Sequence, residues 1–183
     1  MNKYKNQMKK LKSYYVKKIE QKFVIEKNIK QLENEINCTL PIDYQIFLLN
    51  FGCIAFEDYV SFSFLEPYSG GDRGSLSVFF GVIPGASYDL IVNYHNYQSR
   101  MPYNFLPIAN DPGGNVVCLS LKGNDKGVVY FWDHNEEEMV HEGEEPGYSN
   151  VYLLANCFDD FINSLEIDDE DDEVCSQISR RMG

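Results

Sequence analysis

Three short apolar runs follow one another between residues 105 and 132, with only turn-forming segments between them. The runs read FLPIA, NVVCLSL and GVVYFW, and the linkers read NDPGG and KGNDKG. A parallel sheet would need a helix after nearly every strand, because each parallel connection must cross back over the sheet. Linkers rich in Gly, Asn, Asp and Pro instead indicate tight turns between neighbouring antiparallel strands.

Helical spacing of apolar residues precedes these strands. A first helix is predicted near the start of the chain and two more follow before residue 52, after a short extended link at residues 23–25. Their apolar faces are Tyr4, Met8, Leu11, Tyr15 and Ile19, then Ile29, Leu32 and Ile36, then Tyr44, Phe47, Leu48 and Phe51. Pro41 suits the first turn of the third helix, and Gly52 is placed to end it in a left-handed conformation.

The remaining elements alternate between the two periods. Val60, Phe62 and Phe64 alternate with serines as in a half-buried strand, residues 66–75 read as a loop, and LSVFFGV reads as another strand. Two further helices are predicted, one capped by Ser87 with a face of Tyr88, Ile91, Val92 and His95, and one capped by Asn156 with a face of Phe158, Phe161, Ile162 and Leu165. NVYLLA adds a last strand. This order predicts an α+β domain with a mainly antiparallel sheet flanked by helices.

The 183 residues fit a single domain with two charged appendages. We expect a basic N-terminal helical extension at residues 1–25, the folded domain at 26–166 and an acidic, disordered tail at 167–183. Residues 1–30 hold ten Lys and two Glu. This basic helix could lie on an acidic membrane or partner, but packing of its apolar stripe on the same chain is favoured, because that surface is always at hand.

The charge balance bears on possible partners. The net charge is −12, and residues 1–30 contribute +8, which leaves −20 for the rest. Such an acidic body repels phosphate, which argues against nucleic acid, and attracts basic proteins. No apolar run is long enough to span a membrane and no secretion signal is evident, so we expect a soluble cytoplasmic protein. The five cysteines lack C-x-x-C spacing, so reduced thiols are expected.

Motifs for catalysis are scarce. The chain has no P-loop, dinucleotide fingerprint, H-E-x-x-H or G-x-S-x-G sequence. Asp111, Asp133 and His134 could bind a divalent metal or form a base with its orienting carboxylate, which keeps a metal-dependent hydrolase as an alternative. No second cluster supplies a nucleophile, so we predict no catalytic residues, no metal and no cofactor. Asp133 is then expected to accept backbone hydrogen bonds at a turn, with His134 solvated. His95 is expected to be a hydrogen-bonded core residue.

The segment HNEEEMVHEGEEP carries six glutamates between residues 136 and 145, with no opposite charge among them. It directly follows a strand pair, so it is anchored at one end. An acidic surface on a rigid sheet is a suitable dock for a basic protein. The predicted contact residues are Asp133, Glu136, Glu137, Glu138, Glu142, Glu144 and Glu145, with Asp111 and Asn115 as the floor of the same surface.

Four separated blocks of the sequence resemble, in order, the hallmark blocks of the SUKH superfamily. They are IKQLENEINCTLPIDYQIFLLNFG, PIANDPGGNVVCLSL, KGVVYFWDHN and VYLLANCFDDFINSLE. The resemblance covers about residues 26–165. That group includes the fungal Smi/Knr cell-wall synthesis regulators and many bacterial immunity proteins. Asn50 is followed by Phe51 where the family usually continues with two glycines.

The resemblance implies a binding module without enzymatic activity. The bacterial members resemble antidotes that neutralise secreted toxins, often nucleases, whose surfaces are basic because they hold phosphates. The leading hypothesis is therefore an immunity protein, monomeric or weakly dimeric, that masks a toxin through its acidic surface. The alternative is a regulatory scaffold that binds cellular proteins.

Overall fold

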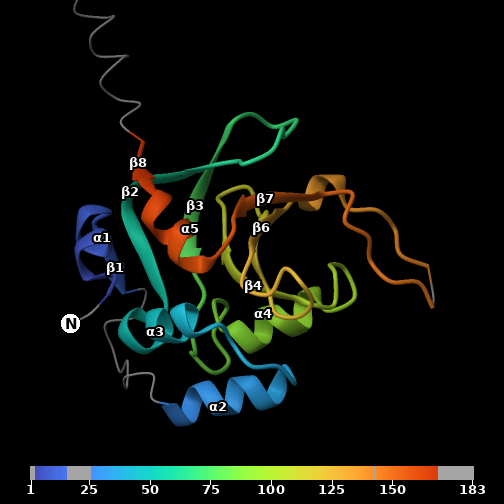
Figure 1. The fold of residues 1–183 in the computed structure, drawn as a ribbon, viewed down its shortest axis with the longest axis horizontal. Helices are drawn as coiled ribbons and strands as arrows, with labels where there is room; N and C mark the ends of the chain where they lie inside the picture. Colours follow the sequence, from blue (N-terminus) through green and yellow to red (C-terminus); the bar gives the residue numbers. More distant parts are fainter. Residues whose placement is uncertain (1–2, 16–25, 142, 169–183) are drawn as a thin grey trace, which may run out of the picture.

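The computed structural model describes residues 3–15, 26–141 and 143–168. Its centre is an eight-stranded sheet in the order β1-β2-β3-β4-β5-β6-β7, with β8 paired to β2 (Figure 1). All pairings between these strands are antiparallel, as predicted. The strands are β1 Ser13–Tyr15, β2 Ile54–Ser63, β3 Arg73–Phe79, β4 Phe105–Asn110, β5 Val116–Ser120, β6 Val129–Trp132, β7 Val151–Ala155 and β8 Glu166–Ile167.

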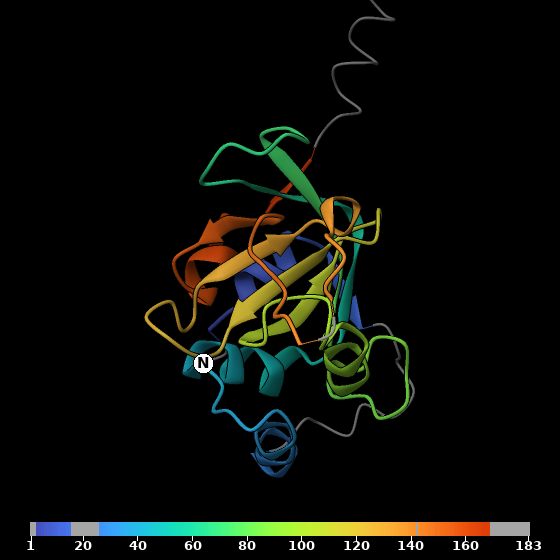
Figure 2. The ribbon, with the colours of Figure 1, turned by 90° about the vertical axis from the view of Figure 1, so that its right-hand side faces the viewer.

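Five α-helices and one 3-10 turn accompany the sheet within the described ranges, which confirms the predicted α+β class. They are α1 Lys5–Lys10, α2 Glu26–Glu35, α3 Ile42–Phe51, α4 Leu90–Tyr97, η1 His134–Glu136 and α5 Phe158–Ser164. Figures 1 and 2 both show α2 as the helix farthest from the sheet.

The interior strand β5 is buried on both faces, which explains why its sequence reads as a continuous apolar run. Val117 and Leu119 point into the main core with α3 and α5. Val116 and Cys118 point to the opposite face, where they pack with Trp132. The sheet therefore separates a large core from a smaller one, and the smaller core contains Val116 at the start of β5 and Trp132 at the end of β6.

Phe158 is the hub of the large core. Its ring centroid lies 4.9 Å from Tyr44, 5.1 Å from Phe47 and 6.3 Å from Phe79. Tyr4 of the N-terminal segment reaches the same ring at 6.2 Å. One side chain of α5 thus joins α3, β3 and the start of the chain.

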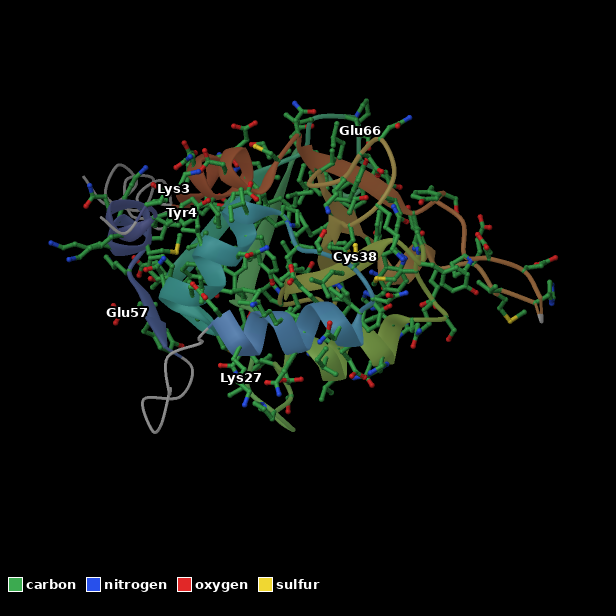
Figure 3. All side chains as sticks on the ribbon, turned by 60° about the horizontal axis from the view of Figure 1, so that its bottom comes forward. Lys3, Tyr4, Lys27, Cys38, Glu57 and Glu66 are labelled. Carbon is green, nitrogen blue, oxygen red and sulfur yellow. The ribbon has the colours of Figure 1, made fainter. Side chains whose placement is uncertain are left out.

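The N-terminal segment is part of this core. Tyr4, Met8 and Leu11 are buried, and the side chain of Gln7 donates to the carbonyls of Ile162 and Leu165 at 3.1 and 2.8 Å. Lys3, labelled with Tyr4 in Figure 3, pairs with Asp159 across the same contact. The apolar stripe of α1 therefore packs on the same chain, as favoured from the sequence.

The predicted length of the first helix is wrong. The chain leaves the helix at Leu11, and Lys12 adopts a positive φ of 50°. Residues 13–15 then pair with β2 as strand β1, so Tyr15 lies in the sheet rather than on a helical face. Ile19 and the predicted link at residues 23–25 lie outside the described residues.

Two predicted helix caps are also wrong. Asp89, not Ser87, caps α4, because its carboxylate accepts from the backbone N–H groups of residues 91 and 92. Cys157, not Asn156, caps α5, with its sulfur accepting from the N–H of residue 160 at 3.4 Å. Gly52 ends α3 as predicted, but the predicted left-handed conformation is wrong, because its φ of 59° is combined with a ψ of −126°.

His95 lies on the exposed side of α4, and its ring nitrogens contact Gln98 and Glu35. The expectation of a core histidine is therefore wrong. Four of the cysteines fall among the described residues, and none of these four forms a disulfide: Cys53 and Cys118 are buried, and Cys38 and Cys157 are half-buried. Cys175 lies outside.

The edge of β2 is completed by both early and late parts of the chain. β1 pairs with residues 54–56, and β8 pairs with Val60 and Ser61. Residue 167, expected in the acidic tail, is therefore part of the sheet, and residues 169–183 lie outside the description. β2 starts six residues before the predicted Val60. β3 starts at Arg73, inside the predicted loop. The Arg73 guanidinium donates to the Ser61 hydroxyl, which gives this buried side chain a hydrogen-bond partner.

The opposite edge strand, β7, is covered by the segment that follows β2. The N–H of Leu65 donates to the carbonyl of Leu153 at 2.9 Å, and the N–H of Leu153 donates to the Glu66 carboxylate at 2.5 Å. Figure 3 labels Glu66 close to this strand. The covering segment thus brings the loop between β2 and β3 against the end of β6.

Candidate functional site

A hydrogen-bonded polar network joins the turn between β4 and β5 to the end of β6. The Asp111 carboxylate accepts from the backbone and the side chain of Asn115 at 2.7 and 2.8 Å. The Asn115 side-chain oxygen in turn accepts from the N–H of His134 at 3.1 Å and lies 2.7 Å from its Nδ1. His134 is half-buried and bonded, so the expectation of a solvated ring is wrong.

Asp133, next to His134, accepts hydrogen bonds from three other residues and is only 4% exposed. Its carboxylate accepts from the N–H of Asn135 at 2.8 Å, which confirms the predicted turn role, and from the hydroxyl of Tyr68 at 2.6 Å. Asn150 donates to its backbone carbonyl at 2.7 Å. Burial and the adjacent Asp133 carboxylate raise the pKa of Tyr68, so its hydroxyl stays a donor.

The metal-site interpretation receives no support from this geometry. The carboxylates of Asp111 and Asp133 are engaged by Asn115 and Tyr68, respectively, and the His134 Nδ1 faces an amide oxygen. Across residues 3–15, 26–141 and 143–168, no group of three or more His, Cys, Asp or Glu side chains is placed to hold a metal ion. Asp111, Asp133 and His134 instead help to hold the β4–β5 turn and the β2–β3 loop against the end of β6.

The acidic segment after η1 is tied down at its root by Arg100, which follows α4. The guanidinium donates from Nε to Glu137 Oε1 at 2.9 Å and from Nη2 to Oε2 at 2.5 Å. It also lies 5.2 and 5.4 Å from the ring centroids of Tyr97 and Trp132. The hydrogen bond to Glu137 raises the pKa of Arg100. A bidentate pair held against aromatic rings fixes both position and direction.

Glu136 provides a second attachment. It accepts from the Ser69 hydroxyl at 2.9 Å and from the hydroxyl of Tyr152. The bond to Glu136, together with burial, raises the pKa of Tyr152 to about 12. Two of the glutamates predicted to face a partner are therefore used within the molecule, because basic and hydroxyl groups distant in sequence approach them.

The rest of the acidic segment projects from the molecule at the end opposite α1 (Figure 1). Glu138, Glu144 and Glu145 are exposed there, while Glu142 lies outside the described residues. The segment surrounds a shallow hollow of about 80 Å³, whose lining includes Arg100, Glu138, Met139, Glu144 and Asn150. The sequence from residue 127 to residue 168 contains no Lys or Arg, so opposite charge reaches this surface only from other segments.

Sequence reasoning missed the residues that hold this surface in place. Tyr68, Arg100 and Asn150 lie 65, 37 and 17 residues from the groups they bind. Arg100 carried one usable signal, since it is the only Lys or Arg between residues 74 and 121. Tyr68 and Asn150 stand in ordinary loop sequence and carried none.

Replacing Tyr68 with Phe is expected to destabilise the fold by about 1–3 kcal/mol, because it leaves the buried Asp133 carboxylate without one of its donors. Chemical denaturation of both proteins measures the difference. Tyr59→Phe is the matched control, since Tyr59 is 75% exposed. Equal stability of the Tyr68 and Tyr59 variants would contradict the role assigned to the Tyr68–Asp133 bond.

The sequence model of the SMI1/KNR4 family (SUKH-1) matches residues 24–164, and this chain belongs to that family. The match spans the sheet from β2 to β7 and the helices from α2 to α5, while α1 and β1 precede it. A relative from Bacillus subtilis (strain 168), described as the SPbeta prophage-derived uncharacterized protein YokK, is 31% identical over 172 residues, covering 80% of this chain and 79% of the relative.

In the part of the chain that the structure describes, no helix is long and apolar enough to cross a membrane.

Proposed function

We propose that this chain is a non-enzymatic immunity protein that binds and neutralises a polymorphic toxin in the cytoplasm. Membership in the SUKH family supports a role of this kind with a protein partner. The toxin class that fits best is a nuclease, because a surface that holds phosphates is basic and complements an acidic protein.

The observation that carries the proposal is the projecting acidic segment. Glu138, Glu144 and Glu145 are exposed on it, and Arg100 is engaged by Glu137 at its root. Charges left exposed on a fixed loop raise the rate at which a basic partner is captured. We assign the direct contacts to these three glutamates and to Glu142.

The other predicted contact residues take a supporting role in this proposal. Asp133 and Asn115 are buried, and Asp111 is half-buried and bonded to Asn115. Glu136 and Glu137 hold the segment to the sheet. A loop held by such contacts before binding loses little conformational freedom when it docks, which favours affinity.

The test uses the C-terminal domain of the protein encoded beside this chain's gene, called the neighbour-encoded domain below. Expressed alone in a bacterial host, it should stop growth and degrade nucleic acid. Co-expression of this chain should restore growth, and the two purified proteins should form a complex without enzymatic turnover. An unrelated acidic protein of the same net charge is the control and should not rescue.

Persistent growth arrest in the presence of this chain would sink the proposal. So would a neighbouring gene that encodes no toxic domain. A pull-down that recovers several housekeeping proteins would instead support the regulatory scaffold.

A further inference from the structure

We propose that Met139 and Val140 form an apolar anchor that inserts into an apolar recess on a basic protein surface. The glutamates on either side face the basic rim of that recess. The inference rests on the proposed function and adds what holds the complex together once it has formed.

Met139 is the most exposed large apolar side chain among the described residues, at 87%. Its neighbour Val140 is 36% exposed. Tyr148, on the returning arm of the same segment, is 55% exposed, but its ring packs on Phe105 and its hydroxyl donates to Asn104 at 2.8 Å, so it is not part of the anchor. Single exposed apolar residues are common on protein surfaces. Ile42, Tyr59 and Leu65 are each exposed singly elsewhere on the chain, whereas Met139 and Val140 are adjacent on one projecting segment. We infer from this pairing that the surface around them becomes covered.

The surrounding charge decides which occupant fits. Glu138 precedes the apolar pair, and Glu144 and Glu145 follow it on the same hollow. An anionic membrane or a nucleic acid would be repelled by these groups. A second copy would bring another acidic body against them. A basic protein surface satisfies the glutamates at the rim and covers the apolar pair at the centre, which is the usual layout of a protein interface.

The root of the segment makes such an anchor effective. Glu137 is held by Arg100, and Glu136 by Ser69 and Tyr152, so the chain leaves the sheet in a fixed direction immediately before Met139. Methionine itself is unbranched and adapts to irregular recesses. We therefore expect the glutamates to set the rate at which the complex forms, and Met139 and Val140 to set the rate at which it dissociates.

The experiment measures binding of the neighbour-encoded domain, in a catalytically inactive form, at low and physiological salt. The Met139→Ala, Val140→Ala double variant should dissociate about tenfold to a hundredfold faster. Its association rate should stay within about twofold, and the salt dependence of association should not change. The control is Ile42→Ala, because Ile42 is 70% exposed on α3, away from the segment. It should leave both rates unchanged.

Met139→Leu distinguishes apolar contact from a disturbed loop. Leucine has a similar apolar volume, so this variant should dissociate within about threefold of the unmodified protein. Dissociation as fast as that of the alanine variant would overturn the anchor.

An unchanged dissociation rate in the double variant, with normal binding by the unmodified protein, would overturn the anchor and leave the proposed function intact. Failure of the unmodified protein to bind the neighbour-encoded domain would overturn both.

Discussion

Replacing Glu138, Glu144 and Glu145 with lysine is expected to slow association with the neighbour-encoded domain by about tenfold to a hundredfold at low salt. These glutamates are exposed on the projecting segment, so their charge acts on a partner before contact. Raising the salt concentration should bring the association rates of the variant and the unmodified protein closer together, because ions screen exposed charges over about 8–10 Å. Stopped-flow or surface-based kinetics at several salt concentrations measures both effects.

A matched charge control is available on the same chain. Glu26, Glu57 and Asp160 are also exposed, and reversing all three produces the same change in net charge. Figure 3 labels Glu57 beside β1, at the end of the molecule away from the acidic segment. This control should slow association far less. Equal slowing by the two triple variants would show that net charge, rather than the segment, governs capture.

Replacing Phe158 with Ala is expected to lower the free energy of unfolding by about 3–5 kcal/mol, the largest stability effect we expect from one substitution. The ring is fully buried and packs against side chains of α3, β3 and the N-terminal segment. Removing it leaves a cavity at the junction of all three. Urea denaturation followed by fluorescence and by far-UV circular dichroism measures the loss.

The control for Phe158 is Tyr103→Ala, because Tyr103 is 51% exposed. Its effect should stay within about 0.5 kcal/mol. A Phe158 variant whose stability matched that of the Tyr103 variant would mean that α5 is not the junction that the ring contacts indicate.

The sequence predicted the parts of the fold that depend on local pattern. The strands β4 to β7 and the helix α3 stand where apolar spacing and turn residues place them. Tyr15 and Ile167 were assigned wrongly because each joins the sheet through pairing with β2, which is distant in sequence. A strand of two or three residues is too short to show an alternating apolar pattern in the sequence. It can be recognised as a strand only from its pairing with a neighbouring strand.

The candidate site divides along the same line. Local sequence predicts the acidic segment and the cap role of Asp133. It also places Asp111 close to Asn115, four residues further along the chain. The attachment of that segment does not, because the Arg100–Glu137 pair depends on where α4 docks on the sheet. Equally, the Tyr68–Asp133 bond depends on how the loop after β2 folds over the edge of β7. Tertiary packing brings these groups together, and the spacing of apolar residues in the sequence does not predict such contacts.

The shared edge of β2 has a consequence for synthesis on the ribosome. β1 covers residues 54–56 early, but Val60 and Ser61 meet their partner only when residues 166 and 167 emerge. Until then a stretch of backbone donors and acceptors stays open to pairing with another nascent chain. We therefore expect chains truncated before residue 166 to aggregate during translation, even though they contain nearly all of the hydrophobic core.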